Sequence, residues 1–170
     1  MATEVNDSGI SADGQNMHPE TALQARWRGR RLLVLDDDEV NRDVLVGLLA
    51  AVGIHADSAH DGARALALAR TTSYDVVLMD ILIPVMNGHE ATRAIRQLPG
   101  YLTVRMIAIS ASARVEDRRR ARNAGLDDFI SKPYTARALY STLLRWLPGS
   151  TLRTGFPMPA ATCAAMCGWC

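Results

Sequence analysis

The segment DVVLMD, residues 75–80, sets four apolar residues between two aspartates. A short, continuous apolar run of this kind, rich in valine and closed by an acid, is typical of a strand that is buried on both faces. Such strands belong to parallel sheets that carry helices on each side. The segment therefore predicts one strand of a covered parallel sheet, with Asp80 at its carboxyl end.

Similar apolar runs occur on either side of this segment and alternate with stretches of helical periodicity. The predicted strands cover residues 32–35, 54–59, 75–80, 104–110 and 129–130, and the predicted helices cover about 40–52, 63–70, 87–97, 114–123 and 135–147. In the first helix the apolar residues at helical spacing are expected to face inward, namely Val40, Val44, Leu45, Leu48, Leu49 and Val52. Five strands alternating with five helices predict one α/β domain over residues 30–148, with a doubly wound parallel sheet.

The segments outside this domain have a different composition. Residues 1–29 lack apolar periodicity and are predicted to form a flexible arm. Residues 149–170 hold too little apolar material for a second domain, and they contain Cys163, Cys167 and Cys170. Three such ligands fall short of the four that a structural zinc site normally needs, so we favour an unstructured tail with reactive thiols.

Composition and charge exclude several classes of protein. The 170-residue chain carries a net charge of +1, which gives no electrostatic reason to expect binding to nucleic acid or to an anionic membrane. No apolar run approaches the roughly 18 residues that cross a bilayer. The first residues are acidic and polar, unlike a secretory signal. The expected location is therefore the cytoplasm.

Polar side chains follow four of the predicted strands at their carboxyl ends. Asp36 and Asp37 follow the first strand, Asp80 ends the third, Ser110 ends the fourth, and Lys132, the only lysine in the chain, follows the fifth. In an open parallel sheet the carboxyl ends of the strands lie at one edge, where ligands bind. We therefore expect three carboxylates, one hydroxyl and one ammonium to converge there.

This set of groups is suited to phosphoryl transfer. Three neighbouring carboxylates repel one another unless a cation lies between them, and Mg²⁺ (or Mn²⁺) prefers oxygen ligands and leaves positions for phosphate oxygens. A carboxylate can attack phosphorus to form an acyl phosphate, and a lysine ammonium suits a phosphoryl oxygen. The residues therefore favour a metal-dependent phosphoacceptor site.

Four stretches carry a family resemblance: LLVLDDDEVNR at 32–42, VVLMDILIPVMNG at 76–88, MIAISASA at 106–113 and AGLDDFISKPY at 124–134. In this order and spacing they resemble the receiver domain of bacterial response regulators, over residues 30–148. The resemblance implies a flavodoxin-like (βα)5 fold with strand order 2-1-3-4-5. The stretch EVNRDVLVGLL at 39–49 is similar to receivers attached to hybrid histidine kinases, although we favour a stand-alone receiver.

The resemblance also implies roles for single residues. Asp80 matches the phosphoacceptor, and the metal ligands implied are Asp36, Asp37, Asp80 and the backbone carbonyl of Leu82. Ser110 and Ala111 match the positions that bind the phosphoryl group. Lys132 matches the lysine that pairs with the phosphate, the Lys132–Pro133 peptide is implied to be cis, and Phe129 matches the aromatic switch residue. Asp38, one position farther on, is expected to cap a helix instead.

The implied function is that of a phosphoacceptor in a two-component phosphorelay, not of an enzyme acting on a separate substrate. The implied partners are a histidine kinase or a histidine phosphotransfer protein, and a downstream protein that binds the surface of the fourth helix, fifth strand and fifth helix. Homodimer formation on phosphorylation is a further option. Leu82 replaces a polar residue that could orient a hydrolytic water, so we expect slow self-dephosphorylation, with Ser112 short and polar nearby.

Three alternatives to a phosphoacceptor function can be compared with the sequence. A non-phosphorylated interaction module would keep the fold without the chemistry, but the intact acidic, hydroxyl and lysine set argues against it. A phosphatase of the haloacid dehalogenase type needs a second aspartate two residues after the nucleophile, where this chain has Leu82. A DNA-binding regulator would need an output domain after residue 149.

Overall fold

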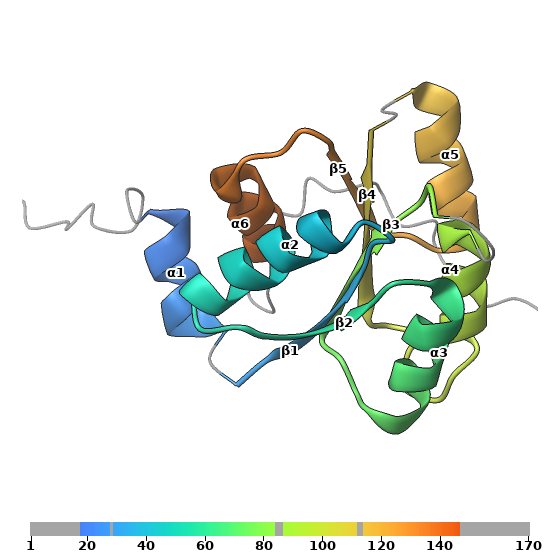
Figure 1. Ribbon diagram of the computed structural model, residues 1–170, viewed down its shortest axis with the longest axis horizontal. Coiled ribbons are helices and arrows are strands. Elements are labelled where there is room, and N and C mark those ends of the chain that lie inside the picture. Colours follow the sequence, from blue (N-terminus) through green and yellow to red (C-terminus); the bar gives the residue numbers. More distant parts are fainter. Residues whose placement is uncertain (1–17, 28, 84–86, 112–113, 147–170) are drawn as a thin grey trace, which may run out of the picture.

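The computed structural model describes residues 18–27, 29–83, 87–111 and 114–146. Five strands form one sheet in the order β2–β1–β3–β4–β5, and each neighbouring pair runs parallel (Figure 1). The strands are β1 (Arg31–Leu35), β2 (His55–Ala59), β3 (Val76–Asp80), β4 (Arg105–Ser110) and β5 (Asp128–Ser131). The predicted doubly wound sheet and its 2-1-3-4-5 order are confirmed.

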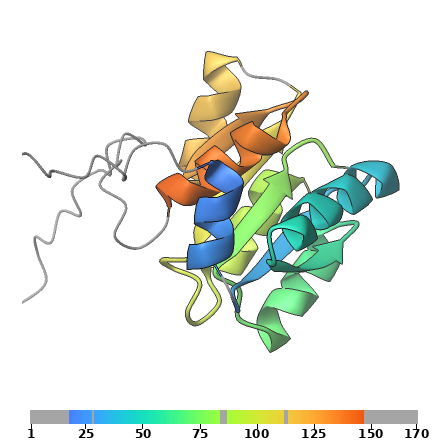
Figure 2. The same ribbon diagram turned by 90° about the vertical axis from the view of Figure 1, so that its left-hand side faces the viewer.

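Six helices lie within the described residues and cover both faces of the sheet. They are α1 (Pro19–Arg26), α2 (Glu39–Ala51), α3 (Gly62–Thr71), α4 (Gly88–Arg96), α5 (Val115–Ala124) and α6 (Ala136–Arg145). Helices α1, α2 and α6 cover one face, and α3, α4 and α5 cover the other (Figures 1 and 2). Because side chains alternate along a strand, each inner strand contributes to two cores. In β3, for example, Val77 and Met79 pack with the α3–α4–α5 layer, and Val76 and Leu78 pack with the other layer.

Side-chain caps fix where several helices begin. Asp38, Asp61, Asn87 and Thr135 each accept a hydrogen bond from a backbone N–H in the first turn of the following helix. These bonds satisfy donors that have no partner inside the helix. The cap at Asp38 confirms the prediction made for that residue. At the C-terminal end of α5, the cap residue Gly125 adopts the left-handed conformation with φ of 102°, which glycine tolerates without strain.

Helix α1 differs from the prediction of a flexible arm over residues 1–29. Pro19–Arg26 is helical, and α1 packs against α6. Leu23 and Trp27 are almost completely buried in the core formed by α1, α2 and α6, and the side-chain amide of Gln24 donates to the carbonyl of Ala51 at the end of α2, at 3.3 Å. For residues 18–27 the prediction was therefore wrong, because two large apolar side chains are enough to dock a short helix.

The inward face predicted for α2 is narrower in the structure. Leu45, Leu49 and Val52 are buried, and Leu48 is partly buried against the same core. Val40 and Val44 are instead 70% and 49% exposed. Both lie in the first half of the helix.

Some sequence predictions fall outside the described residues. These are the arm over residues 1–17, Ser112, the helix end at Pro148–Gly149, and the tail with Cys163, Cys167 and Cys170. Within the part of the chain that the structure describes, no helix is both long and apolar enough to span a membrane.

Candidate phosphoacceptor site

The sheet brings the predicted site residues together at the carboxyl ends of its strands. Asp36 directly follows β1, Asp80 ends β3 beside it, and Lys132 directly follows β5. Asp36, Asp37 and Asp80 each offer a carboxylate oxygen, and these oxygens lie within 4.8 Å of one another. The acidic cluster predicted from the strand ends is therefore present.

The three carboxylates differ in their surroundings. Asp36 and Asp80 are only 1% and 6% exposed, whereas Asp37 is open to solvent. One oxygen of Asp36 accepts the backbone N–H of Asp38 at 3.0 Å, and one oxygen of Asp80 accepts the backbone N–H of Leu82 at 2.8 Å. In both aspartates the second oxygen faces the shared site, so the backbone orients the two buried carboxylates toward each other.

Lys132 lies between the two buried carboxylates. Its Nζ donates to Oδ2 of Asp36 at 2.7 Å and to Oδ2 of Asp80 at 2.6 Å. Burial alone would lower the pKa of Lys132, but the hydrogen bonds to both aspartates and their negative charges raise it above the usual 10.5. The ammonium therefore stays charged at neutral pH and offsets part of the repulsion between the carboxylates. The Lys132–Pro133 peptide is cis, as the resemblance implies.

The start of α4 is packed directly against the strand that carries Asp80. A Cβ placed on Gly88 would lie 2.5 Å from the carbonyl oxygen of Asp80 and 2.8 Å from the Cα of Ile81. Contacts this short with backbone atoms are not tolerated, so only glycine fits there. Asn87 and Glu90 form a reciprocal capping box that fixes the first turn. Helix α4 is therefore held tightly against the acceptor strand.

The remaining predicted residues line the same region or connect it to the core. Ser110 is buried at the end of β4, and Ala111 follows it on the surface. Phe129 is buried in the α3–α4–α5 layer, with the guanidinium of Arg118 stacked 4.9 Å from its ring centre. The side chain of Leu82 is 62% exposed, so it leaves the approach to Asp80 without a polar group at that position.

Sequence reasoning missed Arg42 as a part of the site. Its guanidinium donates to the backbone carbonyls of Asp36 and Asp37, at 3.0 and 3.2 Å. Side chains in a helix point back toward the N-terminus, so an arginine in the first turn of α2 can reach the loop that precedes it. The position of an arginine one helical turn after the acidic pair could have predicted this contact. Arg42 holds the backbone of the acidic pair and makes no hydrogen bond to its carboxylate oxygens.

The donor set fits a hard divalent cation. Clustered carboxylate oxygens, one pair of them buried and oriented by backbone N–H groups, are the ligands that Mg²⁺ takes in proteins. The exposed carboxylate of Asp37 leaves the cluster accessible from solvent, so that water and phosphate oxygens could complete the coordination.

The sequence profile of the response regulator receiver domain matches residues 32–144. The chain belongs to the receiver domain family. Its five-stranded sheet and the acidic edge of that sheet agree with this assignment.

Relatives of this receiver include parts of sensor histidine kinases. The receiver is 38% identical over 112 residues to the sensor histidine kinase RcsC of Salmonella typhi, a match that covers 66% of this chain and 12% of RcsC. It is 32% identical over 146 residues to the sensor histidine kinase GacS of Pseudomonas protegens, covering 84% of this chain and 16% of GacS. The chain thus spans only a small part of these relatives.

Solved structures show the same architecture. The receiver domain of the sensor histidine kinase PA1611 from Pseudomonas aeruginosa is 35% identical to this chain, with a TM-score of 0.66. The match covers 69% of this chain and 97% of that one, and the PA1611 structure has a magnesium ion coordinated in the active-site cleft. The chemotaxis protein CheY4 of Vibrio cholerae is 28% identical, with a TM-score of 0.68, covering 69% of this chain and 98% of that one. This receiver is therefore similar both to receivers of hybrid kinases and to a chemotaxis response regulator.

Proposed function

We propose that this receiver accepts a phosphoryl group on Asp80 from a phosphohistidine of a histidine kinase or a histidine phosphotransfer protein. The observation that carries the proposal is the position of Asp80: a buried carboxylate, bonded by one oxygen to the Leu82 amide and by the other to the Lys132 ammonium, within 4.8 Å of two further carboxylates. A carboxylate used only for structure would not need two acidic neighbours, whose repulsion it must bear.

The transfer itself exchanges one bond to phosphorus for another. An oxygen of Asp80 forms a bond to phosphorus while the P–N bond to the partner's imidazole breaks, and the imidazole nitrogen keeps the electron pair and takes up a proton. Asp36, Asp37, Asp80 and the Leu82 carbonyl would hold Mg²⁺ or Mn²⁺, which when bound neutralises charge on the phosphoryl oxygens. Lys132 would move from Asp80 Oδ2 to a phosphoryl oxygen, while keeping its bond to Asp36.

Phosphorylation would then shift a two-state equilibrium. Ser110 and the Ala111 amide would bind the phosphoryl group at the end of β4, and Phe129 would follow Ser110 from the adjacent strand β5. Because Arg118 stacks on Phe129, a movement of the ring would also affect α5. The surface of α5, β5 and α6 would change, and with it the affinity for a downstream protein or for a second copy of the chain.

Phosphorylation by a small donor tests this proposal. The full chain is incubated with acetyl phosphate and Mg²⁺, and intact mass spectrometry should show an acid-stable, base-labile phosphoryl adduct. Asp80→Asn should abolish the adduct, whereas Asp38→Asn, which changes a neighbouring aspartate that caps α2, should leave it intact. Absence of the adduct in the wild type would favour a receiver that acts only as a binding module. Its survival in Asp80→Asn would show that the wrong acceptor was named.

The rate of dephosphorylation tests the role of Leu82. Its exposed apolar side chain cannot orient an attacking water, so the adduct should decay slowly. Leu82→Asn should speed the decay by a factor of several, followed as loss of the adduct after the donor is removed. Leu102→Asn is the matched control, because Leu102 is also exposed but lies in the loop before β4. Equal decay rates in all three proteins would show that Leu82 does not limit hydrolysis.

A further inference from the structure

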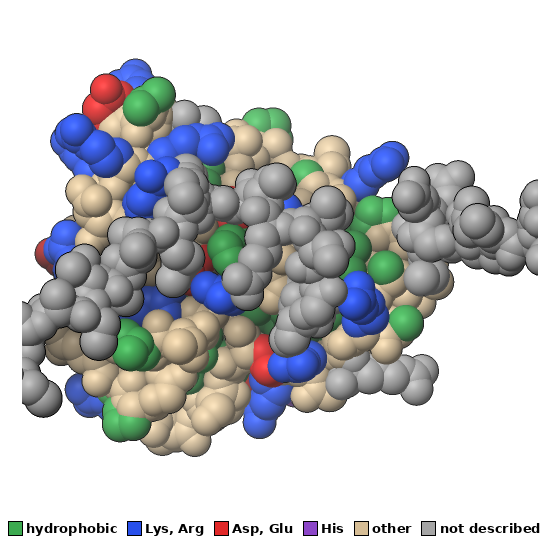
Figure 3. All heavy atoms as spheres, turned by 180° about the vertical axis from the view of Figure 1, so that it is seen from behind, with side chains coloured by type: hydrophobic (Ala, Val, Ile, Leu, Met, Phe, Trp, Pro, Cys, Tyr) green, Lys and Arg blue, Asp and Glu red, His purple; other side chains and the backbone are tan. Residues whose placement is uncertain are grey.

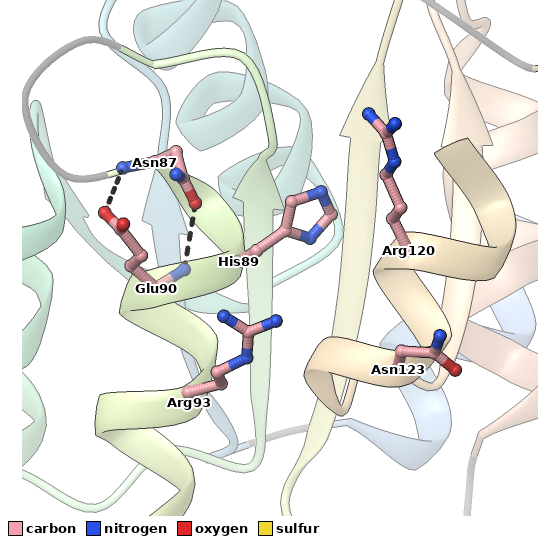
Figure 4. Close-up of a pocket in the computed structure, with 6 residues that line it drawn as sticks. All are labelled: Asn87, His89, Glu90, Arg93, Arg120 and Asn123. Atoms are coloured by element: carbon pink, nitrogen blue, oxygen red, sulfur yellow. Dashed lines mark hydrogen bonds between the residues drawn. The ribbon is translucent and has the colours of Figure 1, made fainter. Parts of the chain in front are cut away.

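A second cleft lies between α4 and α5, and none of the residues that line it belongs to the acceptor site. Its volume is about 250 Å³, and it is lined by Asn87, His89, Glu90, Arg93, Arg120 and Asn123. The first four come from the cap and the first turns of α4, and the last two come from α5. Figure 4 shows His89 and Arg93 extending from α4 toward the helix that carries Arg120 and Asn123.

The cleft has an excess of positive charge that is not paired within the described residues. Neither the Arg93 nor the Arg120 guanidinium has a hydrogen bond or an ion pair among those residues. The acidic lining residue, Glu90, is turned away toward Asn87, whose backbone N–H it accepts at 3.3 Å in the capping box (Figure 4). Arginine side chains also gather over α5 as a whole, where they form the blue cluster at the upper left of Figure 3. The two cleft arginines therefore face a shared space without an ion pair to Glu90, and another carboxylate, Asp117 on α5, acts on His89 but does not line the cleft.

His89 adds a polar atom without a hydrogen-bond partner to the residues around the cleft. Its Nδ1 is buried and has no hydrogen-bond partner among the described residues. Buried polar atoms without a partner are rare, and each needs an explanation. Burial, followed by the charges of Arg93 and Arg120, lowers the pKa of His89, with Asp117 acting in the opposite direction. The ring is therefore neutral at pH 7 and keeps one N–H donor.

We infer that the cleft between α4 and α5 binds a small anion with phosphate or carboxylate oxygens, held by Arg93 and Arg120 with His89 and Asn123 as further donors. Guanidinium groups present N–H donors in a fork that matches both kinds of oxygen, and two such forks facing one space can hold one ligand from both sides. The volume suits a phosphomonoester or a small carboxylic acid and is too small for a folded partner.

The position of this cleft gives binding a consequence for the rest of the molecule. Helix α4 is packed through Gly88 against the backbone of Asp80, and α5 is the next helix in the chain after Ser110. An anion held between the two helices would therefore link the two helices that come next in the chain after Asp80 and Ser110. This inference concerns binding alone and does not depend on phosphorylation of Asp80.

Titration of the ¹⁵N-labelled full chain tests the inference. Inorganic phosphate and, separately, acetate are added at constant ionic strength in EDTA, so that no divalent cation recruits phosphate to the acceptor site. Saturable shifts should centre on the amide and side-chain signals of His89, Arg93, Arg120 and Asn123. Saturation by phosphate alone, by acetate alone or by both would each support the site and would identify the oxygens that it prefers.

Three single variants make the test specific. Arg93→Gln and Arg120→Gln should each weaken binding about tenfold, as loss of one charge-assisted hydrogen-bond donor predicts. Arg119→Gln removes the same charge from an exposed neighbour on α5 that does not line the cleft, and binding should stay within about twofold of wild type. Absence of saturable shifts, or equal weakening by all three variants, would overturn the inference.

Discussion

Replacement of Lys132 by methionine gives a direct measure of how the acceptor site is held together. Methionine keeps a long, unbranched apolar stem and removes only the ammonium. In the absence of a divalent cation, Asp36 and Asp80 would then face each other without a positive charge between them. We therefore expect Lys132→Met to lower the free energy of unfolding, although the fold itself is retained.

The size of the loss follows from the two ion pairs. The Nζ of Lys132 lies 2.7 and 2.6 Å from carboxylates that are almost fully buried. Removal of one partner from a buried ion pair costs about 3–5 kcal/mol. The lysine side chain is itself 19% exposed, so water can enter when it is truncated. We therefore expect a loss near the lower limit, about 3 kcal/mol.

Urea unfolding followed by circular dichroism in EDTA measures this loss by linear extrapolation. The wild type, Lys132→Met, Asp80→Asn and the double variant form a double-mutant cycle. Loss of the Asp80 charge leaves less repulsion for the lysine to offset. Lys132→Met should therefore cost at least about 1 kcal/mol less in the Asp80→Asn background. Mg²⁺ should restore more stability to Lys132→Met than to wild type, because the cation replaces the missing charge.

Two results would refute this reasoning. If Lys132→Met unfolded at the same urea concentration as the wild type, the ammonium would not be compensating the buried carboxylates. If the two substitutions were additive, Lys132 and Asp80 would not be coupled in solution. Lys132→Arg separates charge from shape: it should keep most of the stability, yet impair phosphorylation on Asp80 or the conformational change that follows, because a planar guanidinium does not replace a compact ammonium.

Three further predictions test other parts of the structure. Gly88→Ala should lower the free energy of unfolding in urea by about 1–3 kcal/mol, because the new Cβ meets the Asp80 carbonyl. Gly47→Ala is the control: this glycine is in an open position within α2, so the substitution should be neutral or should raise the free energy of unfolding by up to about 1 kcal/mol. Leu23→Ala should cost about 2–5 kcal/mol if α1 is part of the core, and a loss below about 0.5 kcal/mol would show that α1 does not dock. Burial raises the pKa of Tyr74 to about 12, so the ultraviolet titration of this side chain should have its midpoint there instead of at 10. The stability that neutral Tyr74 contributes should be complete below pH 10 and lost as the pH rises through 12.

The sequence was sufficient for the sheet and for the acidic edge because both depend on local patterns. Each buried strand is a short apolar run, and a polar residue closes it at the end that parallel strands share. The register of the sheet then places Asp36, Asp80 and Lys132 together without further information. Only the family resemblance, and no pattern of residues, assigned the strand order and the separate roles of these side chains.

Other features could not be predicted because they depend on tertiary contacts. In α1, PETALQAR has a single large apolar residue, and its burial requires the surface of α6, which is more than 100 residues away in the chain. Val40 and Val44 follow helical spacing correctly, but they remain exposed, because spacing alone does not tell which part of the helix the rest of the fold covers. The cleft between α4 and α5 likewise requires knowledge of how two helices face each other, which no spacing within either helix contains.

The contrast between Arg96 and Lys132 shows why this chain uses a single lysine among 19 basic side chains. The guanidinium of Arg96 uses its wide fork to donate to several backbone carbonyls and to the carboxylate of Asp127 at once, and these acceptors are spread around it. Lys132 needs the opposite geometry, a single charged atom between two carboxylates. A compact ammonium on a flexible stem can leave one carboxylate for an incoming phosphoryl oxygen while it stays bonded to the other. The residue that is rare in the composition is therefore the one whose shape the proposed transfer requires.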